Sequence, residues 1–300
     1  MRSTDGDEAL TSRAEGLLVD DRTAIVTGGT RGVGRSITRV LASTGMSVLV
    51  CDIAPETDEQ VAALAADGLD VSAVRCDISR ADDVTRAVQV ATDRFGSVDV
   101  LVNNAAISRR SGPLDPWPKA LADFDDIVGV NLRGAYLFAR ALLPSMVQRR
   151  RGHVINVTTD HVHTCGWPVL VPHDDAQDCP WAHEVRPPGV PGMDVYDASK
   201  WALQGLTFAW AKALRESRVR VNSIALGATD GGTLRESLGY RDIEPPAEVL
   251  ASWQDPDDVA AVILDLMAEG PDGRSGDSIG LWRGHPTVLP PPSPILDVRS

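Results

Sequence analysis

Short apolar runs alternate with longer stretches of helical period along most of the chain. Six runs rich in β-branched and aliphatic residues predict strands at residues 23–28, 47–52, 71–77, 98–105, 152–159 and 219–226. Between them, apolar positions repeat at helical spacing over residues 33–44, 56–67, 81–95, 119–148 and 194–216. Near-continuous apolar strands that alternate with helices predict a parallel sheet covered on both faces. The pattern therefore predicts an α/β fold, a doubly wound parallel sheet in a single domain.

Three segments depart from this alternation. Residues 1–20 are polar and acidic, which predicts a mobile leader, and residues 286–300 form a Pro-rich tail. Residues 160–195 carry Pro, His, Asp, Trp and Gly without periodicity and are too long for an ordinary connection. The predicted domain therefore spans residues 21–285 and carries an enlarged loop at residues 160–195.

Composition and charge exclude several classes of protein. The chain has 300 residues, of which 43% are hydrophobic, enough for one large α/β domain. Its net charge of −13 argues against nucleic acid and anionic membrane surfaces as partners. No apolar run approaches the ~20 residues of a membrane span, and the N-terminal residues lack a hydrophobic signal core. Four cysteines are too few for a disulfide scaffold, so a cytoplasmic protein is predicted.

The first predicted strand runs into a glycine-rich turn, TGGTRGVG, at residues 27–34. Glycine lets the backbone approach a pyrophosphate, and the start of the following helix supplies N–H groups and a positive dipole. An acidic residue, Asp52, ends the second strand, as a dinucleotide site requires. This combination predicts a Rossmann-type sheet whose phosphate cradle consists of Gly28, Thr30, Arg31, Gly32, Val33 and Gly34.

The choice between NAD and NADP depends on two side chains of opposite charge. The Asp52 carboxylate can accept hydrogen bonds from both ribose hydroxyls of NAD, and it would repel the 2′-phosphate of NADP. Arg31 could instead hold a phosphate. A carboxylate that faces a dianionic phosphate should outweigh one exposed arginine. NAD is therefore the predicted cofactor, and NADP is the less favoured one.

Four ordered motifs give the chain a wider resemblance. They are TGGTRGVG, NNAA at residues 103–106, Asn131 within VNLRG, and YDASK at residues 196–200. Over residues 20–282 the chain resembles the short-chain dehydrogenase/reductase family. That resemblance implies a nicotinamide-dependent enzyme that binds a small-molecule alcohol or ketone. It also implies a homodimer or homotetramer that forms through the helices at about 119–148 and 196–216.

Tyr196 and Lys200 are four residues apart and would share one face of a helix. An adjacent ammonium favours the phenolate and brings the pKa of a tyrosine toward the working range. Such a pair is also common on helix surfaces, but only three lysines occur in this chain. The resemblance implies that Tyr196 exchanges a proton with the substrate oxygen and that Lys200 also holds the nicotinamide ribose.

The resemblance implies further roles for a hydroxyl and an amide. Where this chain has Thr159, the family usually has a serine that hydrogen-bonds the substrate oxygen, and a threonine hydroxyl can make the same bond. Asn131 would support a water-linked proton relay to the lysine. Besides Thr159, three further positions depart from the family pattern, namely Ala106, Leu226 and Gly231. The other cofactor contacts that the resemblance implies are Ile53, Asp77, Ile78, Asn104, Ala105, Gly227 and Thr229.

The enlarged loop carries four of the six histidines: His161, His163, His173 and His183. Imidazole and thiolate suit zinc, but the spacings match no closed zinc pattern, and no metal is predicted. A Cys165–Cys179 disulfide is disfavoured in a cytosolic protein. The loop begins at Thr159 and ends at Tyr196, so it should border the pocket. This favours a lid over the substrate, with a surface excursion or an oligomer contact as the alternative.

Together these features predict an NAD-dependent oxidoreductase that interconverts a secondary alcohol and a ketone on a sizeable, cyclic small molecule. Two alternatives stay open at this point. One is a redox-neutral dehydratase or epimerase with bound NAD, and the other is a non-catalytic NAD-binding scaffold. An intact set of Tyr196, Lys200 and Asn131 argues against the scaffold.

Overall fold

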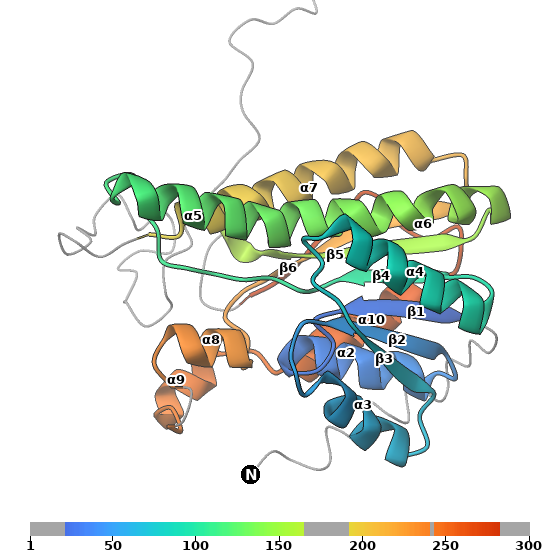
Figure 1. Ribbon diagram of the computed structural model, residues 1–300, viewed down its shortest axis with the longest axis horizontal. Helices are drawn as coiled ribbons and strands as arrows, with labels where there is room; N and C mark the ends of the chain where they lie inside the picture. Colours follow the sequence, from blue (N-terminus) through green and yellow to red (C-terminus); the bar gives the residue numbers. More distant parts are fainter. Residues whose placement is uncertain (1–21, 165–191, 241–242, 283–300) are drawn as a thin grey trace, which may run out of the picture.

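The computed structural model describes residues 22–164, 192–240 and 243–282, and the predicted leader and tail lie outside these ranges. The described residues form one seven-stranded sheet in which every pair of neighbouring strands is parallel (Figure 1). The spatial order is β3-β2-β1-β4-β5-β6-β7. The predicted doubly wound sheet is therefore confirmed. Its strands are β1 Thr23–Thr27, β2 Ser47–Asp52, β3 Val71–Arg75, β4 Val100–Asn103, β5 Gly152–Thr159, β6 Val219–Leu226 and β7 Ser278–Leu281.

The central strands are hydrophobic because both of their faces are covered. All five residues of β1 and all four of β4 are buried. The predicted bounds of β2, β5 and β6 agree with the structure, whereas β1, β3 and β4 are shorter than predicted. The edge strand β7 was not predicted. It has only four residues, one of them Gly280, and none of the four is fully buried, so its sequence lacks a strong strand pattern.

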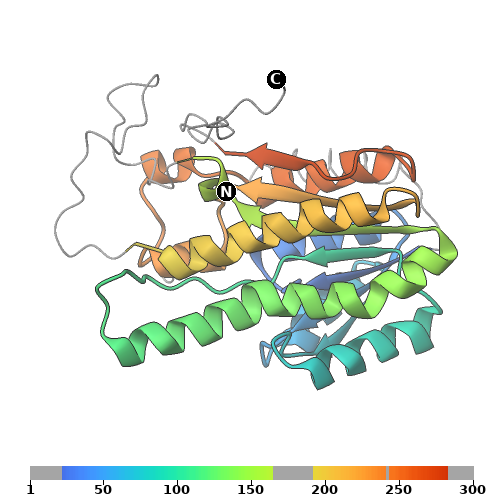
Figure 2. The same cartoon turned by 90° about the horizontal axis from the view of Figure 1, so that it is seen from above.

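Helices cover both faces of the sheet, and each face has its own apolar cluster. On one side lie α2 Gly32–Ser43, α3 Thr57–Ala66 and α10 Pro256–Ala268, the last of which was not predicted. On the other side lie α4 Ala81–Phe95, α6 Ala135–Arg149 and α7 Asp194–Leu214 (Figure 2). No helix in the described ranges is long and apolar enough to cross a membrane.

The helix predicted over residues 119–148 is not one regular α-helix. The structure has α5 Trp117–Val128, a π-helical segment η1 Gly129–Gly134, and then α6. Asn131 lies inside η1, where its Oδ1 accepts the Ile107 N–H at 2.9 Å and its Nδ2 donates to the Ile107 carbonyl at 3.0 Å. A side chain that bonds to a neighbouring backbone in this way explains why the helix widens locally.

The strand order reverses direction between β1 and β4, and the carboxyl ends of these strands mark the place where open α/β sheets bind ligands. The segment after β6 contains two short helices, α8 Gly232–Ser237 and α9 Ala247–Ser252. They follow β6 at this same carboxyl edge (Figure 1). The topology therefore places the glycine-rich turn, the end of β5 and these two helices at the same edge of the sheet.

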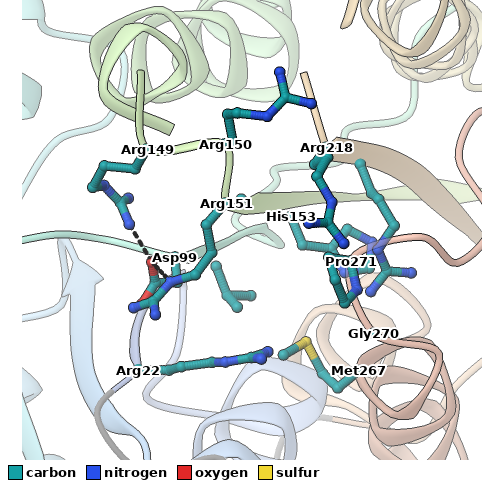
Figure 3. A pocket seen from close by; sticks show the side chains of 13 residues that line it. Arg22, Asp99, Arg149, Arg150, Arg151, His153, Arg218, Met267, Gly270 and Pro271 are labelled. Atoms are coloured by element: carbon teal, nitrogen blue, oxygen red, sulfur yellow. Dashed lines mark hydrogen bonds and ion pairs between the residues drawn. The ribbon is translucent and has the colours of Figure 1, made fainter. Parts of the chain in front are cut away.

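A cavity of about 230 Å³ lies at the opposite, amino edge of the sheet (Figure 3). Within it, Asp99 is 3% exposed and accepts hydrogen bonds from Arg149 and Arg151. These bonds tie the start of β4 to the end of α6. Six arginines line the cavity: Arg22, Arg149, Arg150, Arg151, Arg218 and Arg220.

Candidate functional site

The glycine-rich turn at the end of β1 has the geometry of a phosphate cradle. Gly28 and Gly32 have φ values of +65° and +52°, which glycine adopts without strain. A β-carbon placed on Gly34 would lie 2.0 Å from the Gly28 carbonyl oxygen, so only glycine fits there. The turn leads directly into α2, whose first N–H groups have no carbonyl partner within the helix. The residues present therefore fit a dinucleotide pyrophosphate.

Side chains from two strands hold this turn in place. The Asn104 Nδ2 donates to the carbonyls of Thr27 and Gly28, both at 3.0 Å. In return, the Thr27 Oγ1 accepts the N–H groups of Asn104 and Ala105, both at 3.1 Å. The role of Thr27 was not predicted, because a threonine before a glycine turn has no distinctive pattern. The predicted pair Asn104 and Ala105 thus lies against the cradle.

Asp52 lies at the end of β2 beside the cradle. Its Oδ2 accepts the Thr30 hydroxyl at 2.6 Å and the Thr30 N–H at 3.3 Å, and its Oδ1 accepts the Ala54 N–H at 3.3 Å. The carboxylate is therefore oriented while it stays partly exposed. Arg31 is exposed, and so is Ile53, 59% of whose surface faces solvent.

The residues predicted to flank the adenine follow β3. Asp77 accepts the N–H and the hydroxyl of Ser79 through Oδ1, at 3.0 and 2.7 Å. Ile78 is buried and packs against Gly134 of η1, where an added β-carbon would lie 2.7 Å from its side chain. The Asp77 carboxylate thus bonds within its own turn, while Ile78 belongs to the apolar cluster on the face of the sheet covered by α4, α6 and α7.

The nicotinamide end of the predicted site is built from the residues after β6. The Gly227 N–H donates to the Leu281 carbonyl at 2.7 Å, and the Thr229 hydroxyl donates to the Gly227 carbonyl at 3.0 Å. The backbone of Gly231 then approaches the glycine turn: a β-carbon on Gly32 would lie 3.3 Å from the Gly231 Cα. The missing threonine at Gly231 therefore leaves room for a close backbone contact.

The predicted pair Tyr196 and Lys200 lies on the first turns of α7, where the two side chains meet. The Lys200 Nζ is 5.8 Å from the centre of the Tyr196 ring and donates to the Val157 carbonyl of β5 at 2.8 Å. Lys200 is 2% exposed, and burial lowers its pKa to about 8. Burial also raises the pKa of Tyr196. The nearby Thr159 hydroxyl lowers this pKa in part, while the carboxylates of Asp160 and Asp197 raise it further.

The two threonines at the end of β5 have different partners. The Thr158 hydroxyl donates to the Ile224 carbonyl inside the sheet at 3.3 Å. The Thr159 hydroxyl donates to the Asp160 Oδ1 at 3.2 Å instead, and it lies close enough to the phenol of Tyr196 to lower the pKa of that group. The structure thus brings Thr159, Tyr196 and Lys200 together at one point. Asn131 lies behind them and donates to the Ser199 hydroxyl at 3.1 Å, which in turn donates to the Tyr196 carbonyl at 2.6 Å.

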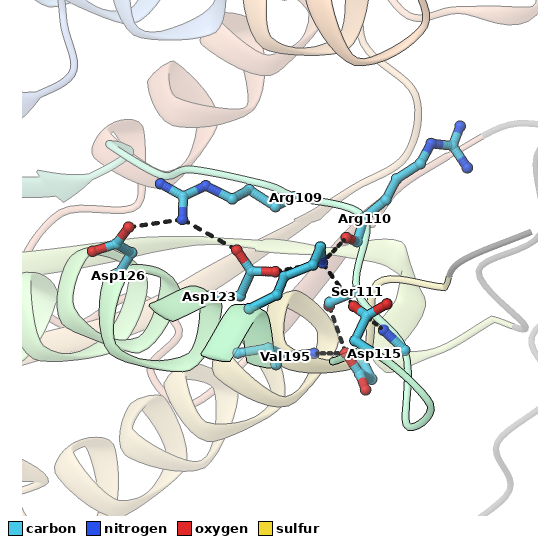
Figure 4. A network of polar contacts seen from close by, with 10 residues as sticks. Arg109, Arg110, Ser111, Asp115, Asp123, Asp126 and Val195 are labelled. Carbon is cyan, nitrogen blue, oxygen red and sulfur yellow. Dashed lines mark hydrogen bonds and ion pairs between the residues drawn. The ribbon is translucent and has the colours of Figure 1, made fainter. Parts of the chain in front are cut away.

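A polar network fixes the start of α7 (Figure 4). Asp123 of α5 is buried and accepts hydrogen bonds from Arg109 at 3.2 Å and Lys119 at 2.7 Å. Ser111 lies in the same connection as Arg109, between β4 and α5. Its hydroxyl donates to Asp194, the first residue of α7. This network anchors the connection after β4 and the helix that carries Tyr196.

Sequence reasoning missed three ionisable neighbours of Tyr196. Asp160 and His161 lie in a short 3₁₀ segment, η2 Asp160–Val162, and Asp197 lies on α7. The His161 Nδ1 is 2.6 Å from the Asp197 Oδ1. Their only signal in the sequence was adjacency to Thr159 and Tyr196, which does not tell which way a side chain points. Acidic and imidazole side chains this close to a phenol can hold or move a proton.

Most of the enlarged loop, with Cys165, Cys179, His173 and His183, lies outside the described residues. His163 is described: its Nε2 is 2.8 Å from the Ser278 hydroxyl, and its ring stacks on Trp282. Within the described ranges, no group of three His, Cys, Asp or Glu side chains is arranged to hold a metal ion. The predicted lid, and the zinc site and disulfide that the sequence disfavours, fall mostly on residues outside the described ranges.

Comparison with known proteins places the chain in a family. Residues 22–168 match the short chain dehydrogenase profile, and residues 186–281 match the Enoyl-(Acyl carrier protein) reductase profile. The chain is 30% identical over 270 residues to Dehydrogenase/reductase SDR family member 4 of Bos taurus, covering 87% of this chain and 86% of that protein. It is 32% identical over 252 residues to the 3-oxoacyl-[acyl-carrier-protein] reductase of Synechocystis sp., covering 82% and 89%.

Solved structures agree with this assignment. A short-chain type dehydrogenase/reductase from Mycobacterium marinum superimposes with a TM-score of 0.72 at 22% identity, covering 91% of this chain and 98% of that one, which supports the fold. A second short chain dehydrogenase/reductase family protein gives 0.68 at 28% identity, covering 88% and 96%. The chain belongs to the short-chain dehydrogenase/reductase family of oxidoreductases. The predicted family membership is confirmed.

Proposed function

We propose that the protein is an NAD-dependent oxidoreductase that interconverts a secondary alcohol and a ketone on a sizeable, cyclic small molecule. The observation that carries this proposal is the meeting of a hydroxyl, a phenol and a buried ammonium, from Thr159, Tyr196 and Lys200, at the carboxyl edge of the sheet. The glycine cradle lies at the same edge. These parts match what a hydride transfer between a carbinol carbon and a nicotinamide requires.

Each side chain takes a role that its contacts support. Thr159 donates a hydrogen bond to the substrate oxygen, and Tyr196 gives a proton to that oxygen or takes one from it. The raised pKa of Tyr196 keeps the phenol protonated at neutral pH, ready to act as an acid in ketone reduction. Lys200 orients the phenol and binds the ribose, and Asn131 positions the start of α7 through Ser199.

The cradle residues would hold the dinucleotide, which supplies the hydride acceptor or donor when bound. The residues that we assign to this contact are Gly28, Thr30, Arg31, Gly32, Val33, Gly34, Asp52, Ile53, Asp77, Ile78, Asn104, Ala105, Tyr196, Lys200, Gly227 and Thr229. We favour NAD over NADP because the Asp52 carboxylate is held beside the cradle by Thr30 and Ala54. A fixed negative charge there disfavours a second phosphate.

We further propose that the protein is a cytoplasmic homo-oligomer. Large apolar side chains are exposed along α5, η1/α6 and α7, three segments that lie side by side (Figure 2). On α7, Trp201 and Phe208 are seven residues apart and therefore on one face, and a β-carbon on Gly205 between them would meet open space. An exposed apolar patch on helices is typical of an interface. The exposed residues are Trp117, Leu121, Phe124, Tyr136, Val147, Trp201 and Phe208.

Turnover of cyclic alcohols tests the activity. The purified protein is incubated with NAD and either cyclohexanol or indanol, and NADH is followed by its absorbance. We expect Tyr196→Phe to lower turnover by roughly 10²–10⁴-fold while NADH binding is kept, because only the proton-transferring hydroxyl is lost. Unchanged turnover in this variant would overturn the proposal. Conversion of an alcohol without any NADH would favour a redox-neutral dehydratase or epimerase.

Calorimetric titration with NADH and NADPH, in the presence of a chelator, tests the cofactor. We expect NADH to bind more tightly than NADPH. Asp52→Asn should reduce this difference in affinity, since the variant keeps the side-chain shape and removes the charge. Arg31→Gln is the matched control on the other side of the cradle. A preference for NADPH that is lost in Arg31→Gln would contradict the assignment to Asp52. Binding of neither cofactor would favour the scaffold.

A further inference from the structure

Arginine is concentrated around the cavity at the amino edge of the sheet (Figure 3). Six of the 13 residues that line it are arginines, whereas Lys and Arg together make up only 29 of the 300 residues of the chain. Most of the lining comes from four segments: the residue before β1, the turn from α6 to β5, the turn from α7 to β6, and the end of α10. The fold therefore assembles a positive cavity in a protein whose net charge is −13.

Acidic groups compensate only part of this positive charge. The ion pairs that the six arginines make within the described ranges use three carboxylates, those of Asp99, Glu269 and Asp272. Asp99 itself lines the cavity, but two arginines already bind its carboxylate. Arg22 and Arg150 have no ion-pair partner in the part of the chain that the structure describes. The cavity thus carries more positive than negative groups.

Arg220 shows the effect of this excess. It is buried, and its guanidinium donates to the Leu266 carbonyl at 2.6 Å and to Glu269 at 3.3 Å. Burial lowers the pKa of Arg220, the carboxylate of Glu269 raises it in part, and the charges of Arg22 and Arg274 lower it further. The positive groups therefore repel one another, and an anion in the cavity would relieve this repulsion.

His153, the second residue of β5, also lines the cavity and is 3% exposed. Its Nε2 is 3.0 Å from the Nδ2 of Asn222. The orientation of that amide is fixed, because its Oδ1 accepts the Asp277 N–H at 3.1 Å and its Nδ2 donates to the Arg274 carbonyl at 2.9 Å. The His153 Nε2 is therefore an acceptor, and the hydrogen of the neutral ring lies on Nδ1.

This Nδ1–H group is a buried donor without an acceptor. Burial and the charge of Arg220 hold the pKa of His153 well below its ordinary value, so the ring is neutral. Among the described residues, the Nδ1 atom has no hydrogen-bond partner. A buried donor that is left unpaired destabilises a folded protein, and most such groups have a partner. An oxyanion in the cavity would supply the acceptor.

Two arginines of the lining have backbone conformations that favour glycine. Arg150 and Arg218 have φ values of +54° and +59°, and no other non-glycine residue in the described ranges has a positive φ. Arg150 lies between α6 and β5, and Arg218 lies between α7 and β6. Glycine would adopt both conformations without strain. Strain of this kind is typical of positions whose side chain serves a binding site.

We propose that this cavity binds a small oxyanion with two negative charges, such as inorganic phosphate. Guanidinium groups bind phosphate oxygens through paired hydrogen bonds, and the Nδ1–H of His153 supplies a further donor. The volume of about 230 Å³ is smaller than the ~300 Å³ at which pockets for drug-sized ligands begin, so a small ion suits it. The anion joins the four segments of the lining and stabilises the folded protein. The site lies at the opposite edge of the sheet from Tyr196 and does not depend on the proposed function.

Thermal unfolding and calorimetric titration with inorganic phosphate test this site. Sodium chloride at equal ionic strength is the reference, because it reproduces general screening of charges. We expect phosphate at ten times its dissociation constant to raise the unfolding temperature by about 2–4 °C. Arg22→Gln and Arg150→Gln should each weaken phosphate binding by about 10-fold, since each removes a cation that has no other anion to bind.

Arg215→Gln is the matched control. Arg215 follows α7 at the same edge of the sheet, but its side chain is 75% exposed and does not line the cavity. This variant loses the same charge as the other two and should keep the wild-type affinity for phosphate.

NMR spectroscopy of the ¹⁵N-labelled wild-type protein tests the role of His153. We expect the Nδ1 proton signal to move downfield and to exchange more slowly with water as phosphate is added, because the group gains an acceptor. His153→Phe keeps a ring of similar shape and removes the donor, so it should weaken phosphate binding by about 10-fold. If this variant does not fold, the titration of the wild-type protein decides the question alone.

Three results would overturn the site. Phosphate that raises the unfolding temperature no more than chloride does would exclude a bound oxyanion. An equal loss of phosphate affinity in Arg22→Gln, Arg150→Gln and Arg215→Gln would show that phosphate responds only to the net charge of the protein. Phosphate binding that leaves the Nδ1 signal of His153 unchanged would place the anion outside this cavity.

Discussion

The two edges of the sheet treat buried charge in opposite ways. At the amino edge, burial raises the pKa of Asp99, but hydrogen bonds and charges from Arg151 and Arg149 outweigh it and the pKa falls below its ordinary value. At the carboxyl edge, Asp160 faces hydroxyls and an imidazole, and burial keeps its pKa raised. Arginines therefore compensate the negative charge of Asp99, whereas burial disfavours the negative charge of Asp160.

The carboxyl edge also buries a cation, the ammonium group of Lys200. Its hydrogen-bond acceptor is the neutral Val157 carbonyl, and burial lowers its pKa to about 8. Groups whose pKa is perturbed in this way cluster at functional sites, whereas paired groups serve the fold. The arginine-lined cavity of Figure 3 therefore marks a structural junction, although it is a defined hollow. Substitutions at the two edges should accordingly have opposite effects on activity and stability.

The largest effect is expected at Lys200. Lys200→Met should lower turnover by roughly 10²–10⁴-fold, because the phenol loses its cationic neighbour. The same change should stabilise the cofactor-free protein by about 1–3 kcal/mol, because a buried charge with a neutral partner is removed at the cost of one hydrogen bond. Kinetics and urea unfolding measure the two effects.

Lys212→Met is the matched control for this prediction, since Lys212 is an exposed lysine on the same helix. It should leave turnover unchanged and alter the unfolding free energy by less than about 0.5 kcal/mol. If Lys200→Met lowered the free energy of unfolding as well as the turnover, the contrast between the two edges would be wrong.

The next effect is expected at Asp99. Asp99→Asn should destabilise the protein by about 2–3 kcal/mol, because Arg149 and Arg151 lose the anion that they bind. The cost stays within this range because the two arginine side chains are 27% and 45% exposed, so water partly solvates them. Turnover below the unfolding temperature should stay at the wild-type value. Thermal unfolding and kinetics check both outcomes, and a loss of turnover in the folded variant would show that the amino edge takes part in function.

The third prediction concerns pH. The pKa of Lys200 is about 8 in the folded protein and about 10.4 in an unfolded chain, so between these values the unfolded chain holds more protons. The contribution of Lys200 to the free energy of unfolding therefore rises with pH between these two values. That contribution is lowest below pH 8 or so, where Lys200 is charged in both states. The advantage of Lys200→Met should shrink as the pH rises from about 8 to 10. A constant difference, measured by urea unfolding at several pH values, would show that Lys200 is not perturbed.

The smallest effect is expected at an exposed ion pair of the amino edge. Arg218 donates to Asp272 at 2.6 Å, but their side chains are 45% and 76% exposed. Asp272→Asn should therefore cost no more than about 0.5 kcal/mol of unfolding free energy, because solvent screens such a pair. A loss of unfolding free energy as large as that of Asp99→Asn would mean that burial does not decide how much these two sets of ion pairs stabilise the protein.

The sequence by itself determined the sheet, the glycine turn and the pair on α7. Apolar strands that alternate with helices predicted the parallel sheet, and the motifs around Gly34, Asn131, Tyr196 and Lys200 predicted the family. These features are local in the sequence, since they depend on period and on short spacing. The edge strand β7 was not predicted, because it depends on pairing with a strand that is distant in the sequence.

The tertiary structure alone decided how the charges are compensated. Asp99 and Asp160 both lie next to strand ends, and the sequence does not show which distant groups will face them. Folding brings two guanidinium groups to Asp99 from the end of α6 and the residues beyond it, about 50 residues away in the sequence. Asp160 keeps the hydroxyls of Thr159 and Thr164 and the imidazole of His161 from its own segment, and folding adds the nearby phenol of Tyr196. Because the free energy of a buried charge depends on its neighbours in space, only the folded chain distinguishes a carboxylate that arginines compensate from one whose pKa burial raises.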